Sequence, residues 1–419
     1  MLAPQLVNRT PPLLRQRTFA RFWTAQTVSY LGDQVTMVAL PLMAILILGA
    51  SPAQLGYLAA AASLPYLLLG VHAGALVDRV EDRKRVLVAA DLFRALLLLS
   101  VPAAFWMTGL TMVHLYAVAF LTGSLGVLFN VSASSLFPVL MPRTQFVEGN
   151  SLLRGSFSFS WVAGPGIGGF IVQAASAPIA LVLDAISFLG SALLLGSIRP
   201  AEPARDHNRA KVRVIAGLSY LLTHPVLRPR VLSTTALNFC YTMYSTVLLL
   251  FAARELRLSP VMIGLAIGAG AVGALVGSVL TARVSRRIGI GPALILGSIV
   301  YPGVLLLIPA APDSNQWIAA AIIAAAEFLS GMGLMLLDIT GTSLQQAITP
   351  EHMLARITGA SMALISGARP LAALVAGGLG TWLGLGNTIS LAAALGILST
   401  VILIASPIRT LRELPDTQP

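Results

Sequence analysis

Apolar runs separated by short polar connections recur along the whole sequence. Each run has about 20 residues, which is the length at which an α-helix crosses the hydrocarbon core of a bilayer. A helix also satisfies its own backbone hydrogen bonds in lipid. Only 10% of the residues are charged and 56% are hydrophobic, whereas soluble domains average about 25% charged residues. The pattern predicts an all-α polytopic membrane protein and argues against a soluble globular fold.

We place twelve transmembrane helices on the sequence. They cover residues 22–48, 54–77, 86–107, 112–138, 150–174, 177–198, 229–252, 259–282, 290–311, 315–340, 354–382 and 385–406. The longest polar segment divides these helices six and six. We therefore predict an N-terminal six-helix bundle over residues 1–198, a cytoplasmic linker with a short surface helix over 199–228, and a C-terminal six-helix bundle over 229–419.

The basic residues are concentrated in alternate connections. Residues 49–54, 108–111 and 174–177 hold no Lys or Arg, whereas residues 78–85, 142–154, 199–230 and 283–287 hold several. Basic loops remain in the cytoplasm, so we expect a multi-pass protein of the cell membrane with both termini cytoplasmic. The net charge of +11 then reports topology, and we expect no nucleic-acid partner. The single cysteine, Cys240, leaves no cysteine framework for a disulfide or a metal within one chain.

The two halves share short sequence patterns. Ser135-Leu136 followed by Pro142 recurs as Ser343-Leu344 followed by Pro350, at the same internal spacing. Arg79 and Arg83 recur in the same way as Arg283 and Arg287. Weak internal symmetry with a period of half the chain is typical of transporters built by duplication, whose site lies between the halves.

The charged loop GALVDRVEDRKR carries a recognisable pattern. Gly74 is followed after three residues by Asp78 and Arg79, and then by a basic cluster that includes Arg83 and Arg85. This loop resembles the signature that follows the second helix in the major facilitator superfamily. The resemblance implies a cytoplasmic latch that holds one conformation. The alternative is a solvated loop that only sets topology.

A second motif lies in the predicted fifth helix. It runs from Ser160 to Gly169 and resembles the signature of the superfamily's antiporters, with Gly164, Pro165, Gly168 and Gly169 in place and a serine at the first glycine. The Gly-Pro step permits a bend, and the glycines allow close helix packing. A sealed bundle or ordinary small-residue packing both fit these residues.

The first helix, FARFWTAQTVSYLGDQVTMVALPL, is similar to the drug/proton antiporter branch that includes macrolide exporters and the enterobactin exporter. The resemblance implies the major facilitator fold, with two pseudo-symmetric six-helix bundles. It also implies export of amphipathic organic compounds by alternating access, in exchange for protons. We expect a monomer without cofactor or bound metal.

Three ionisable residues fall in the middle of predicted membrane helices: Asp33, Glu327 and Arg369. A charge at mid-bilayer costs about 2.5–3.5 kcal/mol, so each residue is a functional candidate. Asp33 and Glu327 are candidates for proton coupling, and a structural hydrogen bond is the alternative for Asp33. We expect Arg369 to be a lone buried arginine, which requires a counter-ion, and Asp33 and Glu327 are the available candidates. A static salt bridge explains Arg369 equally well.

Two further charges, Asp91 and Arg94, are three residues apart and share one helix face. They are intramembrane charge partners, and a structural ion pair near the cytoplasmic end is the favoured interpretation. Asp184 and Asp338 are expected to be structural or gate residues.

No catalytic constellation and no phosphate-binding Gly-Lys-Ser/Thr loop occur in the sequence. We therefore expect a transporter driven by an ion gradient and not an enzyme. The leading hypothesis is a proton-coupled exporter of compounds such as macrolides or other antibiotics. A dedicated exporter of one natural product, such as a siderophore, and a lysophospholipid-type flippase remain alternatives.

Overall fold

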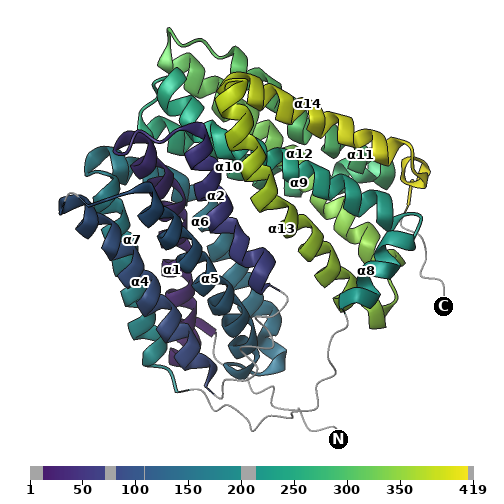
Figure 1. The fold of residues 1–419 in the computed structure, drawn as a ribbon. Coiled ribbons are helices and arrows are strands. Elements are labelled where there is room, and N and C mark those ends of the chain that lie inside the picture. The colour runs from purple at the N-terminus through teal and green to yellow at the C-terminus, as the bar shows by residue number, and fades with distance from the viewer. Residues whose placement is uncertain (1–12, 71–81, 108, 200–213, 414–419) are drawn as a thin grey trace, which may run out of the picture.

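The structure, a computed structural model, describes residues 13–70, 82–107, 109–199 and 214–413 (Figure 1). Long helices account for most of this part of the chain, and no strand occurs within it. The prediction of an all-α polytopic membrane protein is confirmed.

The N-terminal half forms one bundle in the described residues. Its helices are α1 (Arg17–Leu46), α2 (Pro52–Leu69), α4 (Arg83–Trp106), α5 (Met112–Leu136), α6 (Phe146–Ala174) and α7 (Ala177–Gly196). α1 packs against α6 and α7, α7 against α4, α4 against α5, and α5 against α2. Three short 3-10 segments, η1 (Leu13–Arg15), η2 (Phe137–Val139) and η3 (Arg143–Gln145), lie at one end of it.

The C-terminal half forms a second bundle. Its helices are α9 (Leu227–Leu250), α10 (Pro260–Ile288), α11 (Ile290–Gly303), α12 (Gln316–Ile348), α13 (Glu351–Trp382) and α14 (Leu385–Ile404). α12 packs against α10 and α11, and α9 packs against α13 and α14. A short helix, α8 (Val214–Thr223), lies in the connection between the halves and packs against α13.

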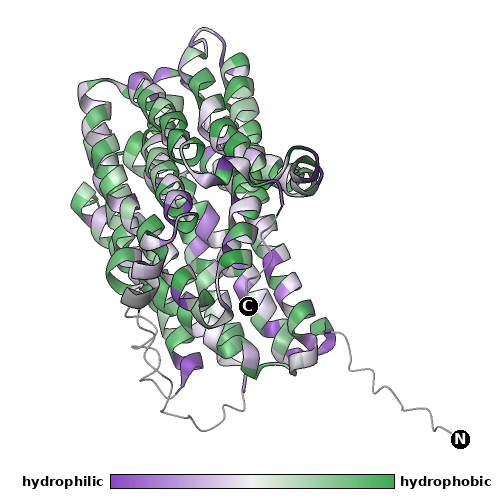
Figure 2. Cartoon of the chain, turned by 90° about the vertical axis from the view of Figure 1, so that its right-hand side faces the viewer, coloured by the Kyte–Doolittle hydropathy of each residue, from purple (hydrophilic) through white to green (hydrophobic). Residues whose placement is uncertain are grey.

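Apolar residues predominate along the long helices (Figure 2). Ten helices of the described residues are long and apolar enough to cross a membrane. α2 and α6 are not among them. The described part of α2 ends at Leu69, and the many Ser and Gly residues between Gly155 and Gly169 lower the hydropathy of α6. α2 packs between α5 and α13, and α6 packs between α1 and α10. Both helices therefore lie within the bundles at the positions of the second and fifth predicted spans.

The bundles meet mainly through two helix pairs, α2 with α13 and α6 with α10. The closest approaches involve glycines near the first turns of α2 and α10. A Cβ atom on Gly56 would lie 2.7 Å from the Ala373 carbonyl, and one on Gly169 would lie 3.2 Å from the Gly264 Cα. From this end the bundles diverge toward the end that carries α8 (Figure 1). The structure is thus closed at one end of the bundles.

Several helix boundaries differ from the predictions. α1 begins at Arg17 and not at residue 22, because Phe19 and Phe22 are buried. The predicted helix over 290–311 is α11 followed by a 3-10 segment, η5 (Val304–Ala310). Pro302 and Pro309 lack the backbone N–H that a regular α-helix requires. α9 continues into a π-helical segment, η4 (Phe251–Glu255), and the last 3-10 segment is η6 (Pro407–Thr410).

Candidate functional site

The centre of α1 carries Asp33, whose carboxylate forms an ion pair with the guanidinium of Arg94 on α4. The Arg94 side chain is only 8% exposed, whereas that of Asp33 is 44% exposed. The guanidinium also lies over the ring of Phe188 on α7, 3.9 Å from the ring centroid. The Asp33 carboxylate therefore pairs with a buried cation, and the rest of its side chain remains accessible.

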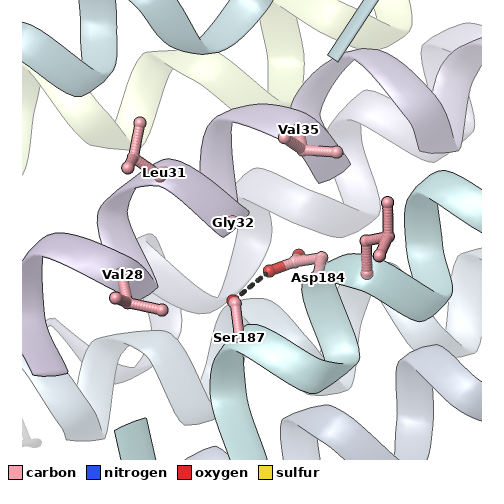
Figure 3. A pocket seen from close by; sticks show the side chains of 7 residues that line it. Val28, Leu31, Gly32, Val35, Asp184 and Ser187 are labelled. Carbon is pink, nitrogen blue, oxygen red and sulfur yellow. Dashed lines mark hydrogen bonds between the residues drawn. The ribbon is translucent and has the colours of Figure 1, made fainter. Parts of the chain in front are cut away.

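A second carboxylate of the same region is Asp184 on α7, which is 2% exposed. It accepts hydrogen bonds from the hydroxyls of Thr36 on α1 and Ser187 on α7, the latter at 2.9 Å. Gly32 makes room for this carboxylate, because a Cβ atom there would overlap its Oδ1 and the Ser187 hydroxyl (Figure 3). The absence of a side chain at Gly32 thus allows α1 and α7 to enclose Asp184.

The third carboxylate is Asp91 on α4, which has no exposed surface. Its Oδ1 lies 3.7 Å from Arg94 Nη1, and the Ser191 side chain is its hydroxyl neighbour on α7. We call Asp33, Asp91, Arg94 and Asp184 the acidic cluster. It joins α1, α4 and α7 and sets three carboxyl groups against one guanidinium. Only one cation of the cluster, Arg94, lies among these three carboxyl groups.

A groove of about 180 Å³ borders the contact between α1 and α7. It is lined by Val28, Leu31, Gly32, Val35, Leu183, Asp184 and Ser187 (Figure 3). Its walls are mostly aliphatic, and Asp184 and Ser187 supply its polar atoms.

The C-terminal bundle contains a different arrangement around Glu327 on α12, which is 5% exposed. Its carboxylate accepts a hydrogen bond of 2.7 Å from the Tyr244 hydroxyl of α9. Tyr241 of α9 lies next to Tyr244 and stacks on Tyr301 of α11, with ring centroids 5.3 Å apart. No ion pair of Glu327 occurs in the described part of the chain. Glu327 is therefore held by neutral groups, unlike Asp33.

Arg369 lies in the middle of α13 and is exposed, which corrects the expectation that it is buried. It forms no ion pair with Asp33, Glu327 or any other carboxylate of the described residues. The expected pairing with one of these acids is thus not present in this conformation, because Asp33 binds Arg94 and Glu327 binds Tyr244.

The charged loop after α2 is described only in part. Gly74, Asp78 and Arg79 lie outside the described residues, so the latch stays a prediction. Arg83 donates a hydrogen bond of 3.0 Å to the carbonyl of Ser135 at the end of α5. Arg85 forms an ion pair of 3.0 Å with Asp82, whose carboxylate also caps the start of α4. These two arginines contact their own bundle.

The motif of the fifth predicted helix lies on α6 and faces two neighbours. Gly164 and Gly168 pack against Gln34 and Val35 of α1, where an added Cβ would lie 2.9 Å from Gln34 Cγ and 3.2 Å from Val35 Cα. The remaining glycine, Gly169, faces α10 of the other bundle, and Pro165 presents its carbonyl to Gly264 there. The motif therefore packs α6 within its bundle and also against the second bundle.

The sequence did not single out Asp184 as part of a charged site. Helix periodicity places Asp184 and Ser187 on one face of α7, but it does not reveal that this face packs against α1. Gly32 was the available signal, since a glycine one residue before Asp33 permits a close helix approach.

Two helical bundles with charged groups between and within them define a polytopic membrane transporter. The chain belongs to the Major Facilitator Superfamily, whose sequence profile matches residues 22–373. It is 27% identical over 375 residues to the multidrug efflux pump Tap of Mycolicibacterium fortuitum, covering 85% of this chain and 88% of the pump.

Solved structures share the fold at low identity. A mutant form of the nucleoside transporter NupG aligns with a TM-score of 0.77 and 10% identity, over 93% of this chain and 99% of that one. A bacterial homologue of the iron transporter ferroportin in an inward-facing state aligns with a TM-score of 0.73 and 18% identity, over 93% of this chain and 98% of that one. These similarities support the major facilitator fold.

Proposed function

We propose that this transporter exports amphipathic organic compounds in exchange for protons, and that it resides in the cell inner membrane. Relatives named as multidrug efflux pumps support the export of such compounds. The observation that carries proton coupling is the acidic cluster, in which Asp33 and Asp91 both pair with the single guanidinium of Arg94 and a third carboxyl group, that of Asp184, is buried on the adjacent helix α7. Asp33 is its accessible member, and its position on α1 makes it the group that exchanges a proton for substrate.

The mechanism follows from the neighbours of Arg94. When Asp33 binds a proton or the cationic group of a substrate, its attraction for Arg94 weakens. Asp91, already 3.7 Å from the guanidinium, is then the nearest alternative partner. A proton and a cationic substrate thus compete for Asp33, and their competition couples the two fluxes. Glu327 serves as a second proton site in the C-terminal bundle, held by Tyr244.

The distribution of charge supports one orientation of the protein in the membrane. The end at which the bundles diverge carries Arg83, Arg85, Arg199 and Arg283, and basic ends of membrane helices remain in the cytoplasm. Both termini are then cytoplasmic. The closed end faces outward, and the conformation described above is the one that loads substrate from inside the cell.

A reconstituted transport assay tests this function. Proteoliposomes that contain the purified protein are given a pH gradient, and the accumulation of a cationic dye such as ethidium is followed by fluorescence. The gradient should drive accumulation by the wild type, and collapsing it with nigericin should abolish accumulation. Asp33→Asn should lose gradient-driven accumulation, because its neutral amide can bind neither the proton nor the cationic group of the dye. Asp313→Asn, at an exposed loop position, is the matched control.

Full accumulation by Asp33→Asn would show that the proton role of Asp33 is wrong. A wild-type rate that is indifferent to the pH gradient would refute proton coupling itself. The alternatives are tested in the same vesicles with a ferric siderophore and a labelled lysophospholipid. Transport of one of these, without transport of ethidium or a macrolide, would replace multidrug export by the corresponding narrower function.

A further inference from the structure

Arg369 is a cation without a counter-ion in the middle of a membrane-spanning helix. It is exposed on α13 and makes no ion pair within the described residues. The two acids expected to pair with it are already engaged, Asp33 by Arg94 and Glu327 by Tyr244. An unpaired guanidinium is costly in hydrocarbon, so such residues face a bundle interior or water.

The neighbours of Arg369 show where its side chain points. It lies within electrostatic reach of Tyr66 on α2, in the N-terminal bundle, and of Tyr241 and Tyr301 in the C-terminal bundle. α13 also packs closely on α2 here, since a Cβ atom on Gly367 would lie 3.1 Å from Leu67 Cδ1. Arg369 therefore faces the region between the two bundles and not the lipid.

Tyr66 connects this cation to the acidic cluster. Its side chain is 47% exposed, and its hydroxyl is within electrostatic reach of Asp33, Arg94 and Arg369. The region between the bundles thus presents an accessible carboxylate from the N-terminal half and an accessible guanidinium from the C-terminal half. Tyr66 lies near both groups.

We propose that Arg369 binds an anionic group, a carboxylate or a phosphate, of the transported compound. The compound is then an amphipathic zwitterion, with its anionic group at Arg369 and its cationic group directed to Asp33. This inference rests on the proposed export function and specifies its substrate class. A guanidinium suits this role because its planar donors bind both oxygens of a carboxylate or phosphate. The Tyr66 hydroxyl is the neighbouring donor.

A matched pair of ligands tests the proposal by equilibrium binding to the purified protein in detergent. One ligand is a fluoroquinolone, a zwitterion with one carboxylate and one amine, and the other is its methyl ester, which lacks the anion. The wild type should bind the acid more tightly than the ester. Arg369→Gln should weaken binding of the acid about tenfold to a hundredfold, as for a lost hydrogen bond to a charged group.

Three controls make the result specific. Arg369→Gln should bind the ester as the wild type does, which also shows that the variant is folded. Arg369→Lys should retain part of the preference for the acid, because the charge remains but the planar fork is lost. Arg286→Gln, at an exposed position near the end of α10, should bind both ligands like the wild type.

Equal loss of acid and ester in both Arg369 variants would overturn the proposal and assign Arg369 to the packing or motion of the bundles. Equal affinity of the wild type for acid and ester would also overturn it. Failure of the export function is distinguishable, because wild-type proteoliposomes under a pH gradient would then accumulate neither ethidium nor the fluoroquinolone, whatever the ligand preference measured in detergent.

Discussion

Replacement of Gly32 by alanine tests the contact that encloses Asp184. The added Cβ would overlap Asp184 Oδ1 and Ser187 Oγ and would lie 3.0 Å from Asp184 Cγ. Either α1 and α7 separate, or the carboxylate leaves its hydroxyl donors. Overpacking costs about 1–3 kcal/mol, and a buried polar group without partners costs about 1–3 kcal/mol. Alanine recovers up to about 1 kcal/mol of helix propensity.

We therefore expect Gly32→Ala to destabilise the protein by about 1–2 kcal/mol, measured by denaturant titration of the purified protein in mixed micelles. Removing the Asp184 side chain in the same molecule should relieve the overlap. The double variant Gly32→Ala/Asp184→Ala should be more stable than the sum of the single changes implies, by at least about 1 kcal/mol. Gly190→Ala is the control, since nothing lies within 4 Å of its added Cβ. An unchanged stability of Gly32→Ala, or strict additivity in the double variant, would refute the reasoning.

Three further changes have defined outcomes. Gly169→Leu would overlap the backbone of α10 and should open the closed end of the bundles, which is detected as longer spin-label distances across that end. Gly378→Leu, with open space around its Cβ, should leave these distances unchanged. Tyr244→Phe removes the hydroxyl donor of Glu327 and should destabilise the C-terminal bundle by about 1–3 kcal/mol in the same titration. Nδ1 of His224 accepts two N–H groups at the start of α9, and burial lowers its pKa below the ordinary value of 6.5. The stabilisation by this cap is fully present above pH 6.5 and is lost as the pH falls through the lowered pKa of His224. On acidification, His224→Ala should therefore lose less thermal stability than the wild type.

The sequence predicted the transmembrane helices because hydropathy alone decides which segments enter lipid. The three-residue spacing of Asp91 and Arg94 also predicted that these side chains meet on one face of α4, and they lie 3.7 Å apart. The stronger partner of Arg94 is Asp33, 61 positions away in sequence. Periodicity within one helix cannot identify this pair, because it assigns side chains to faces without assigning faces to neighbouring helices.

The same limit explains the error at Arg369. The position of Arg369 midway along an apolar run predicts a buried side chain, whereas the residue is exposed. α13 packs on α2 of the other bundle and on α9 of its own bundle, and Arg369 lies within electrostatic reach of Tyr66 on α2. Whether such a residue is buried depends on the relative position of the bundles, and no local pattern in the sequence records it.

The charges are distributed less symmetrically than the helices. The cross-bundle pairs α2–α13 and α6–α10 are related by the internal repeat, and Leu136 and Leu344, its matched positions, are both fully buried. Packing has thus kept the symmetry of the repeat. The N-terminal half nevertheless concentrates acids around one arginine, whereas the C-terminal half surrounds its acid with tyrosines and leaves an arginine exposed. Similar packing in the pairs α2–α13 and α6–α10 would let the two bundles rock against each other about these contacts. A zwitterionic substrate, in contrast, needs groups of opposite charge at its two ends. Retained packing symmetry is what rocking of the two bundles would require, and the diverged charge fits the zwitterionic substrate that we propose.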